Sequence, residues 1–443
     1  MHNNQTVLEK GSYRQLLKTL CLPTVVIMLV LVFYNMADTF FIGHTGDPNK
    51  IAAVSLCAPV FSILSAFGTL FGNGGCTLIS ISLGENNQER IKSVSSFCFL
   101  GVLIISSLFI LVVLIFSKQI ISALGGQGET EVFAIIYLRV LILGTPAALF
   151  SSTFCNIVRA DGAAAQSMIA NLLGTISNIL LDALFILIFH WSVAGAALAT
   201  VIGNCMTSLY LIIYIKKSNI FTLNPKEFFA HKKVAFDVAS LGLPMTCSTL
   251  LMSFSSIISN HMMIGYGEIA LAAQGIAGKF GMLIGMLAMG ICMGLQPAIS
   301  YAYGKKNKNR ILYIIKRTAV FTFLIGTSLS VLGFIFRDQI IYSFINNDEV
   351  IRHGSIMIFG SLLTGPFVGW YQLCQTFLQS TGKPSYASFV ALLDKGLIYI
   401  PMLFVMAHLW RLYGIAFSGS VTTLFSLIIA TFLCLKWYKN WSE

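Results

Sequence analysis

Twelve long apolar segments decide what kind of fold this chain can adopt. A membrane-spanning helix needs about 20 predominantly apolar residues, and each segment reaches or approaches that length. Only 10% of the 443 residues are charged, against about 25% in average soluble domains. We therefore predict an all-α integral membrane protein. The predicted spans are 17–42, 51–81, 95–116, 133–158, 166–190, 193–215, 238–264, 270–302, 318–336, 351–380, 385–408 and 412–437.

The positions of lysine and arginine predict the orientation of these spans. With both termini in the cytoplasm, twenty of these residues lie in or beside the inner loops and tails, and five lie outside. Such an excess is typical of cytoplasmic loops, so we expect a multi-pass protein of the cell inner membrane. The net charge of +11 then reflects topology and contact with anionic lipid. We expect no nucleic-acid partner, despite the basic run "YGKKNKNR" (303–310).

The two halves of the sequence resemble each other at an offset of about 220 residues. The segment "SLGENNQERI" (82–91) aligns with "AYGKKNKNRI" (302–311), and "RADG" (159–162) aligns with "QSTG" (379–382). This predicts an N-lobe (1–215), a cytoplasmic inter-lobe loop (216–237) and a C-lobe (238–443), related as parallel six-helix repeats. Repeats of this kind are typical of transporters. The alternative is a duplication without a transport role, as in some membrane enzymes.

Polar side chains recur on one face of the fifth predicted span and on its neighbours. A charge at the bilayer centre costs about 3 kcal/mol on insertion scales, so such residues face the protein interior and usually carry function. Asp38 follows Tyr34 by one helical turn. The fifth-span stripe and the polar pair of the sixth span are Asn171, Thr175, Asn178 and Asp182, and Thr200 and Asn204. We predict that the first, fifth and sixth spans meet there. The alternative is a polar network that only holds helices together.

A convergence of Asp38, Asn178, Asp182 and Thr200 would suit a small cation. Two carboxylates close together in a poorly solvated pocket do not both stay ionised easily, so one binds a proton more readily. The same carboxylate, amide and hydroxyl oxygens are hard ligands that suit Na⁺. The residues alone leave proton and sodium open. We expect no other metal and no cofactor, because none of the ten cysteines forms a CxxC pair.

Three further groups of residues carry open interpretations. Asp394 and Lys395 are adjacent in the eleventh predicted span, as a buried pair or as part of a cavity wall. Arg159 and Asp161 suggest a local ion pair at a cytoplasmic helix end. His261 is either structural or a proton relay. The sequence contains no nucleotide-binding loop and no nucleophile motif, so we do not expect an enzyme.

The chain resembles the multidrug and toxic compound extrusion (MATE) family over almost its whole length. The segments that carry the resemblance are "YNMADTFFIG" (34–43), "NGGCTLISISLGENN" (73–87), "RADGAA" (159–164), "NLLGTISNILLDALFIL" (171–187) and "AGAALAT" (194–200). The resemblance implies a V-shaped pair of lobes with alternating access. It implies export of cationic or amphipathic drugs in exchange for protons or sodium ions, and small-molecule partners only.

The resemblance also implies which residues bind the coupling ion. The residues that match the family's N-lobe cation site are Asp38, Asn178, Asp182 and Thr200, and those that match further pocket positions are Tyr34 and Asn156. Asn171, Thr175, Asn204 and Asn260 complete our candidate substrate pocket, Asn260 because it aligns with Asp38 in the repeat. Other branches of the family have acids in the seventh and tenth helices, which "TCSTLLMSFSSIISN" (246–260) and "GWYQLCQTFLQSTG" (369–382) lack. The N-lobe must then carry the ion coupling.

We therefore predict a monomeric secondary antiporter in which ion binding at Asp38 and Asp182 repacks the first helix and drives substrate out. The rival transport function is a lipid-linked saccharide flippase of the same superfamily. That function favours a cavity rich in Arg and Lys, whereas only Lys279 and Lys395 lie within the C-lobe spans away from the span ends. A membrane enzyme or receptor would need a catalytic constellation or a ligand-binding domain, and the loops are too short for the latter.

Overall fold

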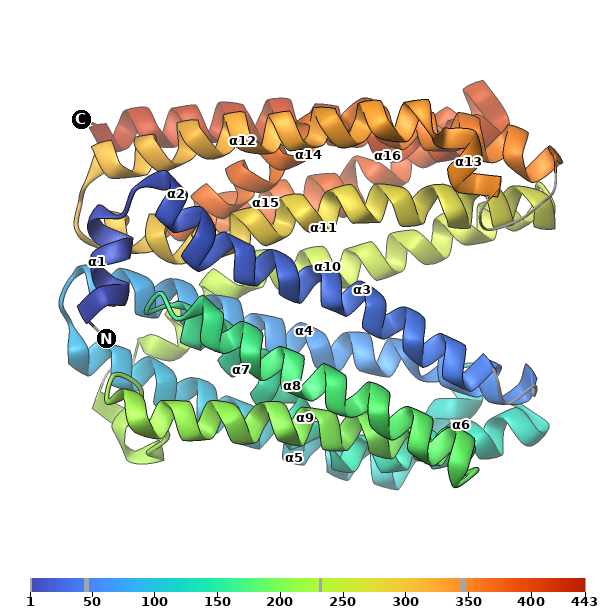
Figure 1. The fold of residues 1–443 in the computed structure, drawn as a ribbon, viewed down its shortest axis with the longest axis horizontal. Coiled ribbons are helices and arrows are strands. Elements are labelled where there is room, and N and C mark those ends of the chain that lie inside the picture. Colours follow the sequence, from blue (N-terminus) through green and yellow to red (C-terminus); the bar gives the residue numbers. More distant parts are fainter. Residues whose placement is uncertain (1, 44–47, 231–232, 343–347, 443) are drawn as a thin grey trace. The chain divides into compact units, whose positions relative to one another are not determined.

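The computed structural model describes residues 2–442 except 44–47, 231–232 and 343–347. Almost all of the described residues are helical (Figure 1), which confirms the predicted all-α class. They form two compact units, Met1–Gly242 and Leu243–Glu443. The boundary falls inside helix α10, just after the segment that sequence analysis assigns to the inter-lobe loop.

The first unit contains the helices up to the first turns of α10. Its elements are α1 (His2–Lys10), α2 (Tyr13–Leu16), η1 (Leu17–Cys21), α3 (Leu22–Gly43), α4 (Pro48–Gly84), α5 (Gln88–Ala123), α6 (Gly128–Leu143), α7 (Thr145–Arg159), α8 (Ala164–Asp182), η2 (Ala183–Ile188), α9 (Ser192–Ser218) and η3 (Pro225–Ala230). Two of these, η1 and η2, are π-helical turns within longer helices, and η3 is a 3₁₀ helix.

The second unit contains the rest of α10 and the helices that follow. Its elements are α10 (Val234–Ile264), α11 (Glu268–Gly304), α12 (Lys308–Ile335), α13 (Arg337–Tyr342), α14 (Asp348–Ser380), α15 (Pro384–Leu392), η4 (Leu393–Leu397) and α16 (Tyr399–Ser442). The η4 segment is a π-helical turn.

The number of membrane spans depends on how two bent segments are divided. Within the described residues, ten helical segments are long and apolar enough to cross a membrane, or eleven if α6 and α7, which meet at 57°, form one span. The segment Pro384–Asn440 covers two predicted spans, because the helix runs on through a break at Arg411, where φ is 50°. Together these account for the twelve predicted spans.

Most of these helices turn their apolar side chains outward. In α5, the window with a mean hydropathy of 3.1 is only 22% buried. Soluble proteins bury such residues, whereas a bilayer accepts them on the outside. The chain is therefore a multi-pass membrane protein, as predicted.

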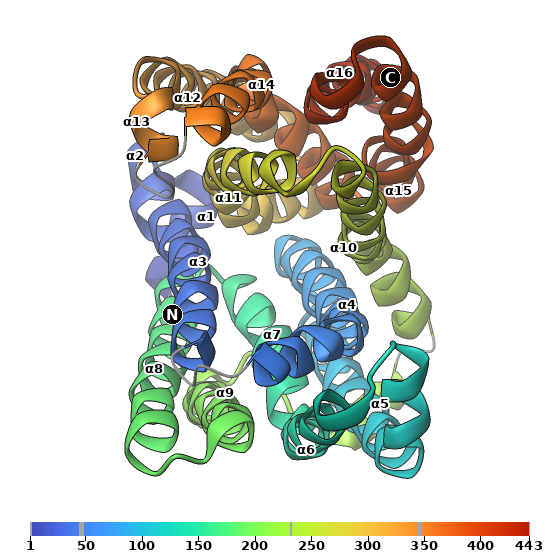
Figure 2. The same cartoon turned by 90° about the vertical axis from the view of Figure 1, so that its right-hand side faces the viewer.

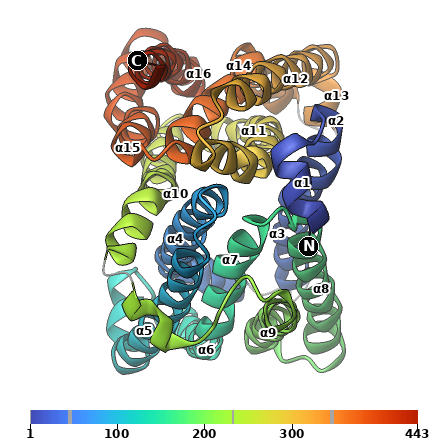
Figure 3. The ribbon, with the colours of Figure 1, turned by 90° about the vertical axis from the view of Figure 1, so that its left-hand side faces the viewer.

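Within each unit the helices form two packed groups. In the first unit α3, α8 and α9 contact one another, and α4 packs against α5 and α7 (Figure 2). In the second unit α11, α12 and α14 contact one another, and α15, η4 and α16 form a second group that α14 also touches (Figure 3).

The predicted repeat is visible in the turns between helices. Between α4 and α5, the backbone N–H of Asn87 donates to the carbonyl of Ser82 at 2.9 Å. Between α11 and α12, the N–H of Asn307 donates to the carbonyl of Ala302 at the same distance. Asn87 and Asn307 also cap the next helix in the same way, each accepting at 3.0 Å from the N–H three residues later. An asparagine at this position satisfies a free N–H of the first helical turn.

The expected inter-lobe loop (216–237) is attached to α5. Ser93 and Ser96 donate to the carbonyls of Phe228 at 3.2 Å and Asn224 at 2.8 Å. Arg90 pairs with Asp237 at 3.0 Å. The segment is thus held on the first unit by hydrogen bonds and an ion pair.

Candidate functional site

Two glycines bring α8 and α9 into close contact beside the predicted site. A Cβ added at Gly174 would lie 2.7 Å from the carbonyl oxygen of Gly203 and 2.0 Å from the Thr207 hydroxyl. A Cβ at Gly203 would lie 2.7 Å from the Gly174 carbonyl and 3.0 Å from the Asn178 Cβ. Small residues let membrane helices approach in this way. The contact places Asn178 directly against α9.

Three of the predicted polar residues meet where α3, α8 and α9 come together. The amide of Asn178 donates to the Thr200 hydroxyl at 3.3 Å. The Tyr34 hydroxyl lies 3.5 Å from the same Thr200 oxygen. Thr200 therefore connects the first predicted span to the fifth and sixth. Asn178 is buried, and its side-chain oxygen has no hydrogen-bond partner among the described residues. A buried amide oxygen of this kind is an available acceptor for a donor or a cation.

Asp182 lies one helical turn beyond Asn178 and is fully buried. It is the last residue of α8, and the π-helical turn η2 begins at the next residue. Single π turns within α-helices are frequent at functional sites. Asp38 lies on α3 one turn beyond Tyr34, and its side chain is outside the described residues.

The remaining N-lobe candidates divide into two places. Asn204 donates to the Thr200 carbonyl at 3.0 Å and accepts from the Ser151 hydroxyl at 3.0 Å, so it extends the cluster to α7. Asn171 and Thr175 are half-buried on α8, and neither makes a side-chain hydrogen bond within the described part of the chain. Sequence reasoning did not identify Ser151, because nothing in an isolated serine shows which helix it faces.

Asn156 belongs to a separate polar group at the other end of α7. It donates to the Ser152 carbonyl at 2.7 Å and accepts from Arg159. Among the described residues, no hydrogen bond links Asn156 to Asn178, Thr200 or Asn204. In the second unit, Asn260 is exposed on α10, as is the adjacent His261.

The predicted pairing of Arg159 with Asp161 is not among the ion pairs of the described residues. Asp161 instead accepts from the Ala163 N–H at 3.1 Å and from the Tyr214 hydroxyl at 3.5 Å. It lies in the turn between α7 and α8 and is buried. Burial raises the pKa of the Asp161 carboxyl from 3.8 to about 6.

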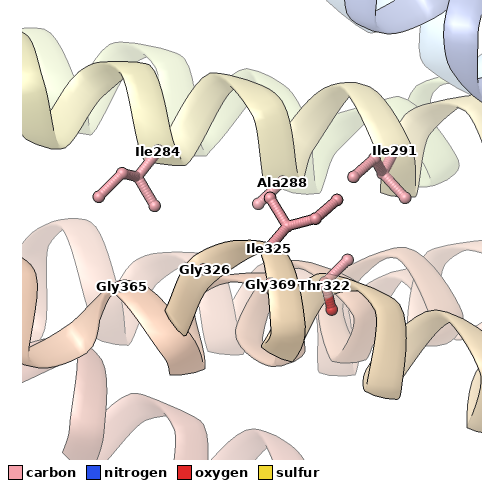
Figure 4. Close-up of a pocket in the computed structure, with 8 residues that line it drawn as sticks. All are labelled: Ile284, Ala288, Ile291, Thr322, Ile325, Gly326, Gly365 and Gly369. Atoms are coloured by element: carbon pink, nitrogen blue, oxygen red, sulfur yellow. The ribbon is translucent and has the colours of Figure 1, made fainter. Parts of the chain in front are cut away.

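One small cavity in the second unit lies among α11, α12 and α14 (Figure 4). Its lining is almost entirely apolar and consists of Ile284, Ala288, Ile291, Thr322, Ile325, Gly326, Gly365 and Gly369. The Thr322 hydroxyl donates to the carbonyl of Thr318 on its own helix at 2.9 Å. The cavity therefore offers no group that would recognise a charged ligand, and we regard it as a packing gap between glycine-rich helix faces.

The described residues contain no cluster of three or more His, Cys, Asp or Glu side chains that could hold a metal ion. The oxygens of Asn178, Asp182 and Thr200 are nevertheless hard ligands of the kind that an alkali cation or a proton would use.

A family model and several named proteins match this chain in both of its halves. The MatE family model matches residues 23–184 and 244–405, one match in each half. The multidrug export protein MepA of Staphylococcus saprophyticus is 33% identical over 427 residues, covering 96% of this chain and 92% of that protein. A Staphylococcus aureus MepA is also 33% identical, over 442 residues, with the same shares covered.

Several solved structures share the fold. A crystal structure of MATE in the bent conformation superposes with a TM-score of 0.91 at 22% identity and covers 99% of this chain and 98% of that one. A MOP superfamily transporter from Pyrococcus furiosus gives a TM-score of 0.89 at 23% identity, with the same coverage. At this identity the likeness establishes the two-lobe fold alone.

Proposed function

Because this chain belongs to the MatE family of membrane transporters, we propose that it is a secondary antiporter that exports organic cations and amphipathic drugs in exchange for protons or sodium ions. The MepA relatives are multidrug export proteins by name, which supports drugs as its substrates. It is a transporter and not an enzyme. We propose that it is a monomer in the cell inner membrane. The lysine and arginine counts support an orientation with both termini in the cytoplasm.

The observation that carries this proposal is a buried acid, Asp182, one helical turn from the hydrogen bond between Asn178 and Thr200. An ionised carboxylate inside a membrane protein is costly unless a cation, proton or donor compensates it. Asp182 is fully buried, and the Asn178 oxygen one turn away is without a hydrogen-bond partner among the described residues. A bound proton would neutralise the acid, and a bound sodium ion would take both oxygens as ligands. We propose that Asp38 on α3 supplies the second carboxylate.

The same cluster offers a way for ion binding to change the conformation. Tyr34 on α3 reaches Thr200 on α9, and Thr200 accepts from Asn178 on α8. An ion that draws the Asn178 amide or the Thr200 hydroxyl toward itself changes the contact that holds α3 in place. Ion binding biases one of two conformations only if its affinity for the two differs. The contact through Tyr34 would supply that difference in ion affinity. The conformation that is open to the cytoplasm would release the ion.

Export of ethidium from proteoliposomes tests this proposal. Proton and sodium gradients are imposed separately on the wild type, on Asp38→Asn and on Glu89→Gln, a control that neutralises an exposed acid of the first unit. We expect one gradient to drive export by the wild type and by Glu89→Gln and to fail with Asp38→Asn. Full gradient-driven export by a correctly folded Asp38→Asn variant would refute a coupling role for that acid.

A further inference from the structure

The second unit contains a buried acid of its own, which the ion-coupling cluster does not use. The side chain of Asp394 is 2% exposed and lies in the π-helical turn η4. It is ten residues beyond Pro384, the first residue of α15. At a rise of about 1.5 Å per residue, it lies roughly 15 Å along the helix, near the middle of a hydrocarbon core about 30 Å thick. An acid at that depth is a candidate functional group.

Asp394 is paired with the next residue of its own turn and lies beside groups from two other helices of the same unit, α16 and α14. The Lys395 ammonium lies 2.6 Å from one carboxylate oxygen. The Thr423 hydroxyl of α16 donates to the other oxygen at 3.4 Å. Tyr371 of α14 is buried within electrostatic reach of the same carboxylate. Its hydroxyl has no hydrogen-bond partner among the described residues, so it is a buried donor beside this carboxylate. The sequence left open whether these residues form a buried pair or part of a cavity wall; the structure pairs them and buries the acid alone.

The pairing of Asp394 with Lys395 depends on the π turn. Adjacent side chains on a regular α-helix point about 100° apart and do not face each other. Ser255 of α10 donates to the Lys395 carbonyl at 2.5 Å and so supplies a partner for a backbone group of the widened turn. A small change in η4 would separate the two side chains without moving the carboxylate out of the helix bundle.

The two charges of the pair differ in access. The Lys395 side chain is 35% exposed, whereas the Asp394 side chain is almost completely enclosed. The ammonium, on its flexible four-carbon stem, is therefore the partner that can move away, whereas the enclosed carboxylate stays in place. Once the ammonium leaves, the bare carboxylate is costly until another cation replaces it.

We propose that Asp394 is a binding site for an organic cation, with Lys395 as an internal cation that the ligand displaces. The ligand is a protonated amine or a flat aromatic cation. The Asp394 carboxylate compensates its charge, and the Tyr371 ring and hydroxyl provide a cation–π face and a donor. A neutral or anionic compound would leave the existing pair undisturbed. This inference rests on the proposed function only in taking cations as substrates, and it does not require ion coupling at Asp182.

Ethidium binding to the full-length protein in lipid nanodiscs tests the displacement directly. Lys395→Met removes the competing ammonium, so we expect ethidium to bind about tenfold more tightly. Asp394→Asn removes the attraction, and we expect binding to weaken about tenfold. In the Asp394→Asn background, Lys395→Met should bring no further tightening, because the two residues act as one unit. Unchanged or weaker binding by a folded Lys395→Met variant would overturn the proposal.

A second measurement uses the wild type and does not depend on whether the variants fold. A small amine-reactive ester labels Lys395 slowly while its ammonium pairs with Asp394. Saturating ethidium should raise labelling of Lys395 severalfold, as measured by mass spectrometry, and leave the exposed control Lys118 unchanged. Labelling that stays constant or falls would overturn the proposal.

Neither assay uses an ion gradient, so the outcomes separate the two proposals. If gradients drive no export but ethidium still displaces Lys395, the ion-coupling proposal fails and this inference holds. If ethidium binds and is exported without any response at Lys395, only this inference fails.

Discussion

The two units place a buried acid at different depths on corresponding helices and compensate it differently. The turns that precede α8 and α15 match at an offset of 220 residues, with Gly162 and Gly382 both at positive φ. At that offset, Asp394 occupies the position of Gly174, which in the first unit lets α8 close on α9. The first-unit acid, Asp182, comes eight residues further along the helix, at the start of a π turn.

We expect a small ion to exchange at the acid of the first unit, whereas the acid of the second unit is already paired with a cation. One turn before Asp182, Asn178 bonds to Thr200 and keeps a side-chain oxygen without a partner among the described residues, an acceptor that a proton or sodium ion could use. The residue after Asp394 is Lys395, and its ammonium already balances the charge of the carboxylate. A tethered cation competes with every free ion at high effective concentration. Small coupling ions should therefore exchange at the first unit, whereas only a ligand with additional contacts can displace Lys395.

The largest expected effect comes from giving the first unit the charge pattern of the second. In Ala183→Lys, a lysine follows Asp182 at the start of its π turn, as Lys395 follows Asp394. We expect gradient-driven ethidium export to fall about 100-fold, the upper range of a coupling free energy between two sites. Initial export rates in proteoliposomes measure this. Ala183→Met, which has similar bulk without charge, should retain most of the export, and equal loss in both variants would contradict the explanation.

A smaller effect is expected from blocking the close approach of α8 and α9. In Gly174→Ala, the new Cβ meets the Gly203 carbonyl and the Thr207 hydroxyl at distances that no real Cβ tolerates. Overpacking of this kind costs about 1–3 kcal/mol, and the displaced Asn178 should bind the ion less well. Thermal unfolding in detergent and export rates measure the two consequences. Gly275→Ala is the control, since nothing lies within 4 Å of a Cβ there.

An effect on stability alone, with no change in export, is expected from an acid that only the first unit has in its helix-connecting turn. The position of Asp161 is taken by Thr381 in the second unit. Because burial raises the pKa of Asp161 to about 6, the folded state binds the proton more tightly than the unfolded state. Stability should therefore fall as pH rises from about 4 to about 6, by up to about 3 kcal/mol, and then level off. Melting temperatures at several pH values should show this fall in the wild type and a flatter profile in Asp161→Asn. Parallel profiles would rule out Asp161 as its source.

Periodicity and the internal repeat were enough to predict the helical class and the two-lobe architecture. Both signals can be seen along the chain itself, since a helix face follows from residue spacing and a repeat from similarity between segments. The partners across helices were not predictable in the same way. Asp161 pairs with Tyr214, which is 53 residues away, and Asn156 turns toward Arg159 because both lie on one face of α7. The π turns have no sequence signal that separates them from α-helix, so the geometry of the Asp394–Lys395 pair remained open.

The central claim, that Asp182 carries the coupling ion, is tested most directly by Asp182→Asn in proteoliposomes. Initial rates of gradient-driven ethidium export and equilibrium ethidium binding are measured on the same preparation, beside the wild type. The account predicts that export loses its dependence on the gradient and slows about 100-fold, while ethidium binding at the second unit persists. Export by the variant at the wild-type rate, with the same gradient dependence, would contradict it.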